Sequence, residues 1–257
     1  MTKQVRIERI REYLRQKGSA TITELSELLA VSHMTIRRDL ASISQKDQLK
    51  TIHGGVVFHE EEEEHKDRYS LSIARIQRLE EKQRIARKAV SLIENGDIII
   101  IDAGSTGELI ATYLPDNIPL TIICSALNIA SIVSSKPNCS LIVTGGYYHR
   151  SSMVLESNEG LNLLKQNRAN KTFITASGVS LKLGVTCSNF FERTTKQTAL
   201  KAAITKILVA DSSKFGMVKT GHFADIDDFD IIITDKGIDE KILQPIRAIE
   251  SIQLHCV

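Results

Sequence analysis

The first 58 residues contain three short amphipathic segments with the period of a helix. In residues 5–18, VRIERIREYLRQKG, apolar side chains recur at helical spacing up to a glycine that is typical of a helix end. Thr23 and Ser32 are placed to cap two further helices, at 23–30 and 33–44, because hydroxyl side chains accept hydrogen bonds from the first free backbone N–H groups. Each of these helices carries its leucines and isoleucines on one face.

The order of these segments predicts a winged helix-turn-helix. Only a short turn separates the second helix from the third, and the third carries basic and polar side chains. The stretch QLKTIHGGVVF at 48–58 then predicts a strand, a Gly-Gly turn and a strand, which correspond to the wing. A trihelical unit that binds protein through a solvated basic face remains the alternative.

From about residue 80 the pattern changes to short apolar, β-branched runs that alternate with amphipathic stretches of helix length. The apolar runs lie at 97–102, 120–125, 141–144, 171–177, 206–211 and 230–234. Continuous apolar strands that alternate with helices predict an α/β domain with a mostly parallel sheet covered on both faces. In such a sheet, ligands bind beyond the carboxyl ends of the strands.

The charge distribution divides the chain in the same place. The 257 residues carry a formal net charge of only +2, but residues 1–58 sum to +4 and the remainder to −2. Five consecutive glutamates at 60–64 repel one another and indicate a solvated linker. We therefore predict a winged helix-turn-helix DNA-binding domain at 1–58, an acidic linker at 59–79 and a ligand-binding domain at 80–257. A Glu run that keeps the DNA backbone away from the second domain is the alternative.

Several classes of protein are disfavoured by composition. No apolar run approaches the roughly 18–20 residues that span a bilayer, and the first residues lack an apolar signal core. The four cysteines lie far apart without a Cys-x-x-Cys pair, which favours buried core residues over a disulfide framework or a zinc site. We expect a cytoplasmic protein without a membrane partner, a metal or a cofactor.

The third helix and the wing supply the candidate DNA contacts. A recognition helix presents its N-terminal residues to base edges in the major groove, and arginines contact phosphate or guanine. The side chains that we expect at the DNA are Ser32, His33, Thr35, Arg37, Arg38, Lys50 and His53. Asp39 cannot favour phosphate contact, so we expect it to orient an arginine or to cap a neighbouring helix.

The end of the first apolar run in the second domain indicates an anion site. Strand 97–101 is followed by Asp102-Ala-Gly-Ser-Thr-Gly107 and then by a helix. Small residues that open a helix after a strand offer free backbone N–H groups and the positive end of the helix dipole to a phosphate. The loop is neither a Gly-x-Gly-x-x-Gly nor a Walker motif, and a simple tight turn is the alternative.

Other strand ends add polar and basic groups. Arg150, Lys214 and the glycine turns suit a phosphorylated small molecule, and Glu192 could accept sugar hydroxyls. The candidate effector-binding residues are Asp102, Gly104, Ser105, Thr106, Gly107, Asn128, Gly145, Gly146, Arg150, Glu192 and Lys214.

These motifs resemble the DeoR family of bacterial transcription regulators. VSHMTIRRDL followed by IHGGVVF matches the family's DNA-binding signature, although Asp47 replaces a usual Gly and Thr51 a frequent Arg. The family's Asp-x-Gly-Ser/Thr-Thr loop matches 102–106, where Gly107 replaces a frequent third hydroxyl, and Asp-x-Ser-Lys-Phe-Gly matches 211–216. The resemblance covers nearly the whole chain and implies an effector domain that is similar in fold to ribose-5-phosphate isomerase and binds phosphorylated sugars.

The resemblance also implies a function. Leu127-Asn128, GGYYH, ASGV and TCSN are most similar to family members that regulate deoxyribonucleoside catabolism, whose effector is deoxyribose 5-phosphate. His149 stands where many members have Arg, so the basic contact is expected to shift to Arg150 or to be lost. We expect a repressor of a sugar or nucleoside catabolic operon, acting on double-stranded DNA as a dimer or a larger even assembly.

An enzyme is the competing class. A sugar-phosphate isomerase with an added DNA-binding domain could use Asp102 or Glu192 as general base. No carboxylate is visibly paired with a second acid–base group in the sequence, so we predict no catalytic residues. A nucleotide-binding redox sensor is disfavoured because Gly-x-Gly-x-x-Gly is absent.

Overall fold

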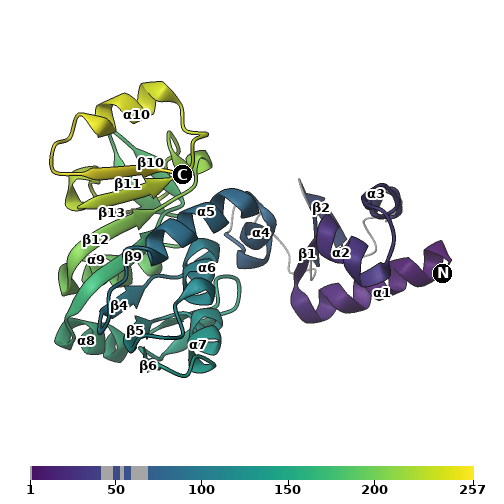
Figure 1. Ribbon diagram of the computed structural model, residues 1–257, viewed down its shortest axis with the longest axis horizontal. Coiled ribbons are helices and arrows are strands. Elements are labelled where there is room, and N and C mark those ends of the chain that lie inside the picture. Colours follow the sequence, from purple (N-terminus) through teal and green to yellow (C-terminus); the bar gives the residue numbers. More distant parts are fainter. Residues whose placement is uncertain (1, 42–48, 53–54, 59–68) are drawn as a thin grey trace. The chain divides into compact units, whose positions relative to one another are not determined.

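The computed structural model describes residues 2–41, 49–52, 55–58 and 69–257. The chain forms two compact units, Met1–Leu79 and Glu80–Val257, which are described separately below (Figure 1).

The N-terminal unit contains the three helices that the sequence predicts. They are α1 (Lys3–Lys17), α2 (Ile22–Leu29) and α3 (His33–Ala41). Ser32 caps α3 as predicted, since its Oγ accepts a hydrogen bond from the Thr35 N–H at 3.3 Å. The cap expected at Thr23 was wrong. Thr21 caps α2 instead, because its hydroxyl and the Glu24 carboxylate bond each other's backbone N–H groups in a capping box.

The predicted wing is also present. A three-stranded antiparallel sheet has the strand order β1-β3-β2, with bounds β1 (Ser19–Thr21), β2 (Leu49–Ile52) and β3 (Gly55–Phe58). The winged helix-turn-helix prediction is therefore confirmed. Helix α4 (Leu71–Ile76) packs against β1 and β3, within the stretch 59–79 that the sequence analysis treats as linker. The glutamates at 60–64 lie outside the described residues.

The C-terminal unit is built on the predicted parallel sheet. Its strand order is β15-β14-β12-β9-β4-β5-β6, and every neighbouring pair is parallel. The strands are β4 (Ile98–Ile101), β5 (Leu120–Cys124), β6 (Cys139–Val143), β9 (Ala169–Thr175), β12 (Ala203–Val209), β14 (Ile231–Thr234) and β15 (Gln253–Cys256). The edge strand β15 was not predicted.

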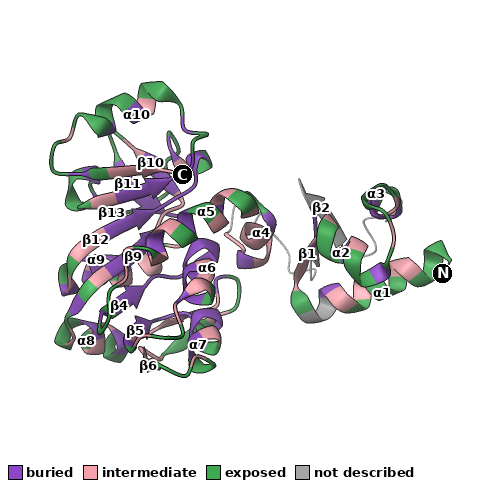
Figure 2. Cartoon of the chain, in the orientation of Figure 1, coloured by how far each residue is buried: buried purple, intermediate pink, exposed green. Residues whose placement is uncertain are grey.

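Helices cover both faces of this sheet. Along β4, Ile99 and Ile101 point into one apolar core and Ile100 into the other, since successive strand residues alternate between faces. Residues of α5 (Leu79–Val90), α6 (Ser105–Tyr113) and α7 (Leu127–Ser134) fill the first core. Residues of α8 (Asn158–Gln166), α9 (Glu192–Ala202) and α10 (Glu240–Arg247) fill the second. Figure 2 shows the buried strands between exposed helix surfaces.

Two small antiparallel sheets complete the unit. The first is a hairpin that pairs β7 (Tyr147–His149) with β8 (Val154–Glu156). The second has the strand order β10-β11-β13, with bounds β10 (Gly178–Ser180), β11 (Gly184–Cys187) and β13 (Gly221–Ala224). Short 3-10 helices follow β12, at η2 (Ser212–Lys214), and β13, at η3 (Ile226–Asp228). Among the described helices, none has the length and apolar character that crossing a bilayer requires.

Candidate functional site

Asp39 fixes the recognition helix to the first helix of the N-terminal unit. The Arg6 guanidinium on α1 donates to both carboxylate oxygens of Asp39 on α3, from Nε at 2.6 Å and from Nη2 at 2.9 Å. Asp39 is buried, and such bidentate pairs are geometrically specific. The expectation that Asp39 orients an arginine is confirmed.

The opposite face of α3 carries the predicted DNA contacts. Ser32, His33, Arg37 and Arg38 are exposed and Thr35 is half-buried, whereas the alternate face of the helix packs into the core. Neither arginine forms an ion pair with a described residue. Lys50 lies in β2, and His53 lies outside the described residues. Met34 on the same helix is 66% exposed and is not among the predicted contacts.

In the C-terminal unit, the Asp102 loop joins β4 to α6 at the carboxyl edge of the sheet. Gly104 has a φ of +117°, which favours glycine, and no side chain caps the first turn of α6. A Cβ added to Gly107 would lie 2.1 Å from the Asp102 carbonyl oxygen, so this position requires glycine for close packing. The loop thus leaves the first N–H groups of α6 without a capping side chain, next to buried Ser105 and Thr106.

A buried lysine that the sequence analysis did not single out lies against Asp102. Lys196 on α9 donates a hydrogen bond to Asp102 Oδ2 and another, at 3.1 Å, to the Thr175 carbonyl oxygen. The same Oδ2 accepts from the Thr175 N–H at 2.9 Å. Glu192 Oε2 lies 3.9 Å from Lys196 Nζ. Asp102, Thr175, Glu192 and Lys196, called the Asp102 cluster below, thereby join β4, β9 and α9.

The cluster perturbs the acid–base properties of its members. Burial lowers the pKa of Lys196, but the attraction of Asp102 and Glu192 outweighs it and holds the pKa above its ordinary value. Burial raises the pKa of Glu192, and the opposing effects of Lys196 and of the Asn189 amide only partly offset it. Lys196 is therefore a charged group that is held inside the protein by its partners.

Asn128, at the start of α7, has an unsatisfied polar atom. Its Nδ2 donates to Glu108 Oε2 on α6 at 2.5 Å, but its buried Oδ1 has no hydrogen-bond partner among the described residues. Leaving such an acceptor unpaired costs about 1–3 kcal/mol. A ligand that donates a hydrogen bond to this oxygen would recover that energy.

The β7–β8 hairpin lies over the ends of β5 and β6. Gly145 and Gly146 turn the chain into it with φ values of +73° and +124°. β8 bridges to Ala126, which follows β5. His149 stacks on Phe191 with ring centroids 3.6 Å apart, and its Nε2 lies 2.7 Å from Glu156 Oε2. The hairpin therefore spans from β5 to the N-terminus of α9.

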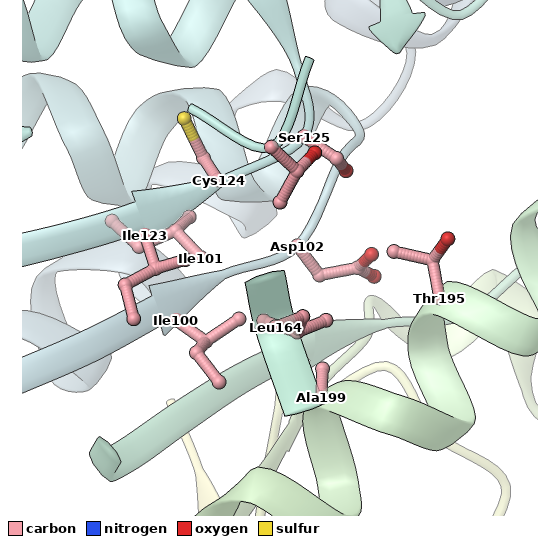
Figure 3. Close-up of a pocket in the computed structure, with 10 residues that line it drawn as sticks. Ile100, Ile101, Asp102, Ile123, Cys124, Ser125, Leu164, Thr195 and Ala199 are labelled. Atoms are coloured by element: carbon pink, nitrogen blue, oxygen red, sulfur yellow. The ribbon is translucent and has the colours of Figure 1, made fainter. Parts of the chain in front are cut away.

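A small cavity lined by described residues adjoins Asp102. It has a volume of about 10 Å³, which is about the room for one water molecule. Figure 3 shows the Asp102 carboxylate pointing toward Thr195 of α9, with Ile100 and Ile123 forming part of the apolar wall. Small-molecule sites usually measure about 300–1,000 Å³, so this cavity would have to widen before it could hold a sugar phosphate.

Neither basic residue expected at the effector has a hydrogen bond or ion pair with the Asp102 cluster among the described residues. Arg150 is exposed in the turn that joins β7 to β8. Lys214 Nζ, at the end of η2, is 4.0 Å from Asp211 Oδ2, and no hydrogen bond or ion pair between described residues connects it to the Asp102 cluster. The structure thus brings Asp102 and Glu192 together through Lys196, and it links Asn128 to α6.

In the part of the chain that the structure describes, no three histidine, cysteine or carboxylate side chains gather as a metal site would require.

The fold and the site define a two-domain DNA-binding regulator with a separate ligand-sensing domain. Residues 6–62 match the DeoR-like helix-turn-helix domain, and residues 77–236 match the DeoR C-terminal sensor domain. The chain belongs to the DeoR family of transcriptional regulators.

Its relatives align over most of their length. The chain is 33% identical to the HTH-type transcriptional regulator GolR of Listeria innocua, covering 89% of each chain. It is 32% identical to the deoxyribose operon repressor of Escherichia coli, covering 90% of this chain and 89% of the relative. Among solved structures, ribose 5-phosphate isomerase A of Methanocaldococcus jannaschii aligns with 52% of this chain and 53% of its own, at 17% identity and a TM-score of 0.39.

Proposed function

We propose that the chain is a transcriptional repressor of a sugar or nucleoside catabolic operon, and that a phosphorylated sugar controls its affinity for DNA. The first candidate effector is deoxyribose 5-phosphate. A relative that is 32% identical is named a deoxyribose operon repressor, and one that is 33% identical, from Staphylococcus epidermidis, a lactose phosphotransferase system repressor. Both names support control of sugar use.

The unpaired Asn128 Oδ1 is the observation that carries this proposal. It is buried on α7, beside the α6 helix whose first turn has no side-chain cap. A phosphate at the first N–H groups of α6 would gain hydrogen bonds and a favourable helix dipole. The sugar hydroxyls would then donate to Asn128 Oδ1 and to the carboxylates of Asp102 and Glu192. An anion site at α6 and an unsatisfied acceptor on the neighbouring α7 together suit a phosphorylated sugar.

Control of DNA binding would follow from a shift between two conformations. The cavity beside Asp102 measures about 10 Å³, and we propose that the sugar phosphate binds a more open form of the carboxyl edge. If that form spaces the recognition helices of an assembly differently, binding of sugar and operator become linked, typically by about 1–3 kcal/mol.

Calorimetry with phosphorylated pentoses and hexoses tests the effector assignment. The native chain should bind one sugar phosphate and not its dephosphorylated form. Asn128→Ala should weaken that binding by at least about tenfold, the equivalent of one lost hydrogen bond of 1.4 kcal/mol. The control Asn162→Ala changes an exposed asparagine on α8 and should leave affinity unchanged. Equal affinities for the two variants would contradict the proposed site.

Turnover must be measured in the same samples. No carboxylate is visibly paired with a second acid–base group in the sequence, yet in the structure Asp102 contacts Lys196 directly. The relatives are regulators, and we propose that this pair holds the site together instead of moving protons during catalysis. Isomerisation of any bound sugar phosphate by the native chain would favour the isomerase alternative.

A further inference from the structure

Helices α8 and α9 form a groove on the surface of the C-terminal unit. The two helices pack side by side (Figure 1), and the groove between them has a volume of about 350 Å³. Lys165 and Arg168 line it from α8 and the segment after α8, and Thr194, Gln197 and Lys201 line it from α9. Small-molecule sites usually measure about 300–1,000 Å³. This α8–α9 groove is therefore large enough to hold a small molecule.

The α8–α9 groove is separate from the Asp102 cluster, although both involve α9. Thr194, Gln197 and Lys201 recur at intervals of three and four residues and thus lie on one face of the helix. Glu192 and Lys196, which belong to the Asp102 cluster, follow a different face. Substitutions on the groove face can therefore leave the cluster intact.

The lining of the groove is basic. Its charged side chains are Lys165, Arg168 and Lys201, and none of the described residues that line it is acidic. Arg168 Nη1 donates to the carbonyl oxygens of Lys165 at 2.7 Å and of Asn167 at 2.9 Å, which fixes the guanidinium beside the end of α8. Neither lysine forms an ion pair with a described residue. The groove therefore favours an anionic ligand.

The helix ends account for only part of this positive charge. Lys165 and Lys201 lie in the last turns of α8 and α9, where the helix dipole presents about half a negative charge for each helix. Two helix ends thus offset about one of the three positive charges, and about two remain. A phosphate monoester carries about −1.5 to −2 at pH 7. The remaining charge of the groove therefore matches one phosphate group.

We propose that the α8–α9 groove binds a phosphorylated small molecule and is a second ligand site of this chain. The guanidinium of Arg168 and the two lysines hold the phosphate, since arginine and lysine are the side chains that proteins use for this group. Thr194 and Gln197 lie on the same lining and offer a hydroxyl and an amide to the polar body of the ligand. The proposal does not depend on the proposed function, because the groove contains no residue of the Asp102 cluster.

Calorimetry of the full chain with inorganic pyrophosphate tests the proposal. The native chain should bind this probe, and Lys165→Glu/Lys201→Glu should weaken binding at least about tenfold, because two attractions become repulsions. The milder variant Lys165→Gln/Lys201→Gln should weaken it about threefold or more. The matched control Lys182→Glu/Lys219→Glu makes the same change in net charge at two exposed lysines outside the groove, and its affinity should stay within about twofold of native.

Four results would overturn the proposal. A native chain that binds no pyrophosphate is the first. Equal losses in the groove and control variants would mean that the probe responds only to net charge. A loss in Asn128→Ala with none in the groove variants would place the probe at α6 instead. A hexaglutamate peptide that binds more tightly than pyrophosphate, and that is lost in the groove variants, would indicate an acidic protein partner.

The same samples separate this proposal from the effector assignment. Lys165→Glu/Lys201→Glu should bind the sugar phosphate of the Asp102 edge with native affinity, which also shows that the variant is folded. If the native chain binds pyrophosphate in the groove but binds no sugar phosphate, the proposed function fails and the groove assignment stands.

Discussion

At the scale of single residues, burial determines which charged side chains form strong ion pairs, and the sequence alone does not show which charged side chains are buried. Asp102 could be predicted because it ends an apolar strand and opens a glycine-rich loop. Lys196 could not, since Thr-Thr-Lys-Gln on a helix resembles any solvated face, and only tertiary packing places its side chain at 2% exposure. The one available signal was its spacing of four from Glu192, which puts both on one face of α9.

Removing Lys196 should destabilise the C-terminal unit strongly. Lys196→Ala leaves the Asp102 carboxylate buried without its partner, and breaking a buried ion pair costs about 3–5 kcal/mol. Urea denaturation measures the loss. The control Lys201→Ala, on the exposed side of the same helix, should stay within about 0.5 kcal/mol. In the double variant Lys196→Ala/Asp102→Asn, the decrease in the free energy of unfolding should be smaller than the sum of the decreases in the two single variants. A decrease equal to that sum would show that the two residues do not interact.

At the scale of elements, the long periodic segments were predictable and the short pairings were not. Apolar runs of four to seven residues identified the strands around β4, and helical spacing identified α1 to α3. The hairpin β7–β8 and the sheet β10-β11-β13 have strands of three or four residues, too short for any period to emerge. Their sequences, GGYYH and TCSN among them, indicated only polar strand ends. Consequently the contact between the hairpin and the N-terminus of α9, where His149 stacks on Phe191, was not expected.

The stack of His149 on Phe191 should limit entry of the effector. Such aromatic pairs contribute about 0.5–1.5 kcal/mol. Phe191→Ala should therefore raise, by about 2- to 10-fold, the population of an open form in which the β7–β8 hairpin has separated from α9. We expect stopped-flow association of the sugar phosphate to accelerate by that factor. Phe190→Ala provides the control, because the neighbouring ring is 66% exposed and does not stack on His149. A slower association in Phe191→Ala than in the control would mean that the ring contacts the effector instead of closing the site.

The recognition helix gives the corresponding prediction for DNA. Arg37 is exposed on α3 and forms no ion pair with a described residue, so its charge is available to the operator. If Arg37 contacts guanine, Arg37→Ala should weaken operator binding by about 1–3 kcal/mol. If Arg37 contacts phosphate, the substitution should reduce by about one the slope of the logarithm of the binding constant against the logarithm of the salt concentration. Fluorescence anisotropy at several salt concentrations distinguishes the two. Arg9→Ala on α1 is a control of equal charge, and equal affinities for both variants would contradict the placement of α3 at the DNA.

At the scale of the whole chain, the small net charge is the sum of a positive N-terminal segment and a slightly negative remainder. A charge of +2 over 257 residues argues against nucleic acid, yet +4 falls within the first 58 residues, where the winged helix-turn-helix lies. The C-terminal unit has no such excess, and its buried Lys196 is already paired with Asp102. Long-range attraction to DNA is therefore confined to one unit, and any effect of a sugar phosphate on DNA affinity must pass between the units or between chains.

The five glutamates at 60–64 provide the last test, because they lie between these two charge distributions in the sequence. Deleting them removes five negative charges near the DNA-binding domain. At about 150 mM salt, the Debye length is about 8 Å, so charges held away from the DNA in solvent are screened. If the run is only a linker, anisotropy should give an operator affinity within about twofold of native at that salt, a change of about 0.4 kcal/mol. A matched variant with the five glutamates replaced by glutamines keeps the length and separates charge from spacing. A large gain in affinity in both variants, fading as salt rises, would instead favour the hypothesis that the glutamates repel the DNA backbone.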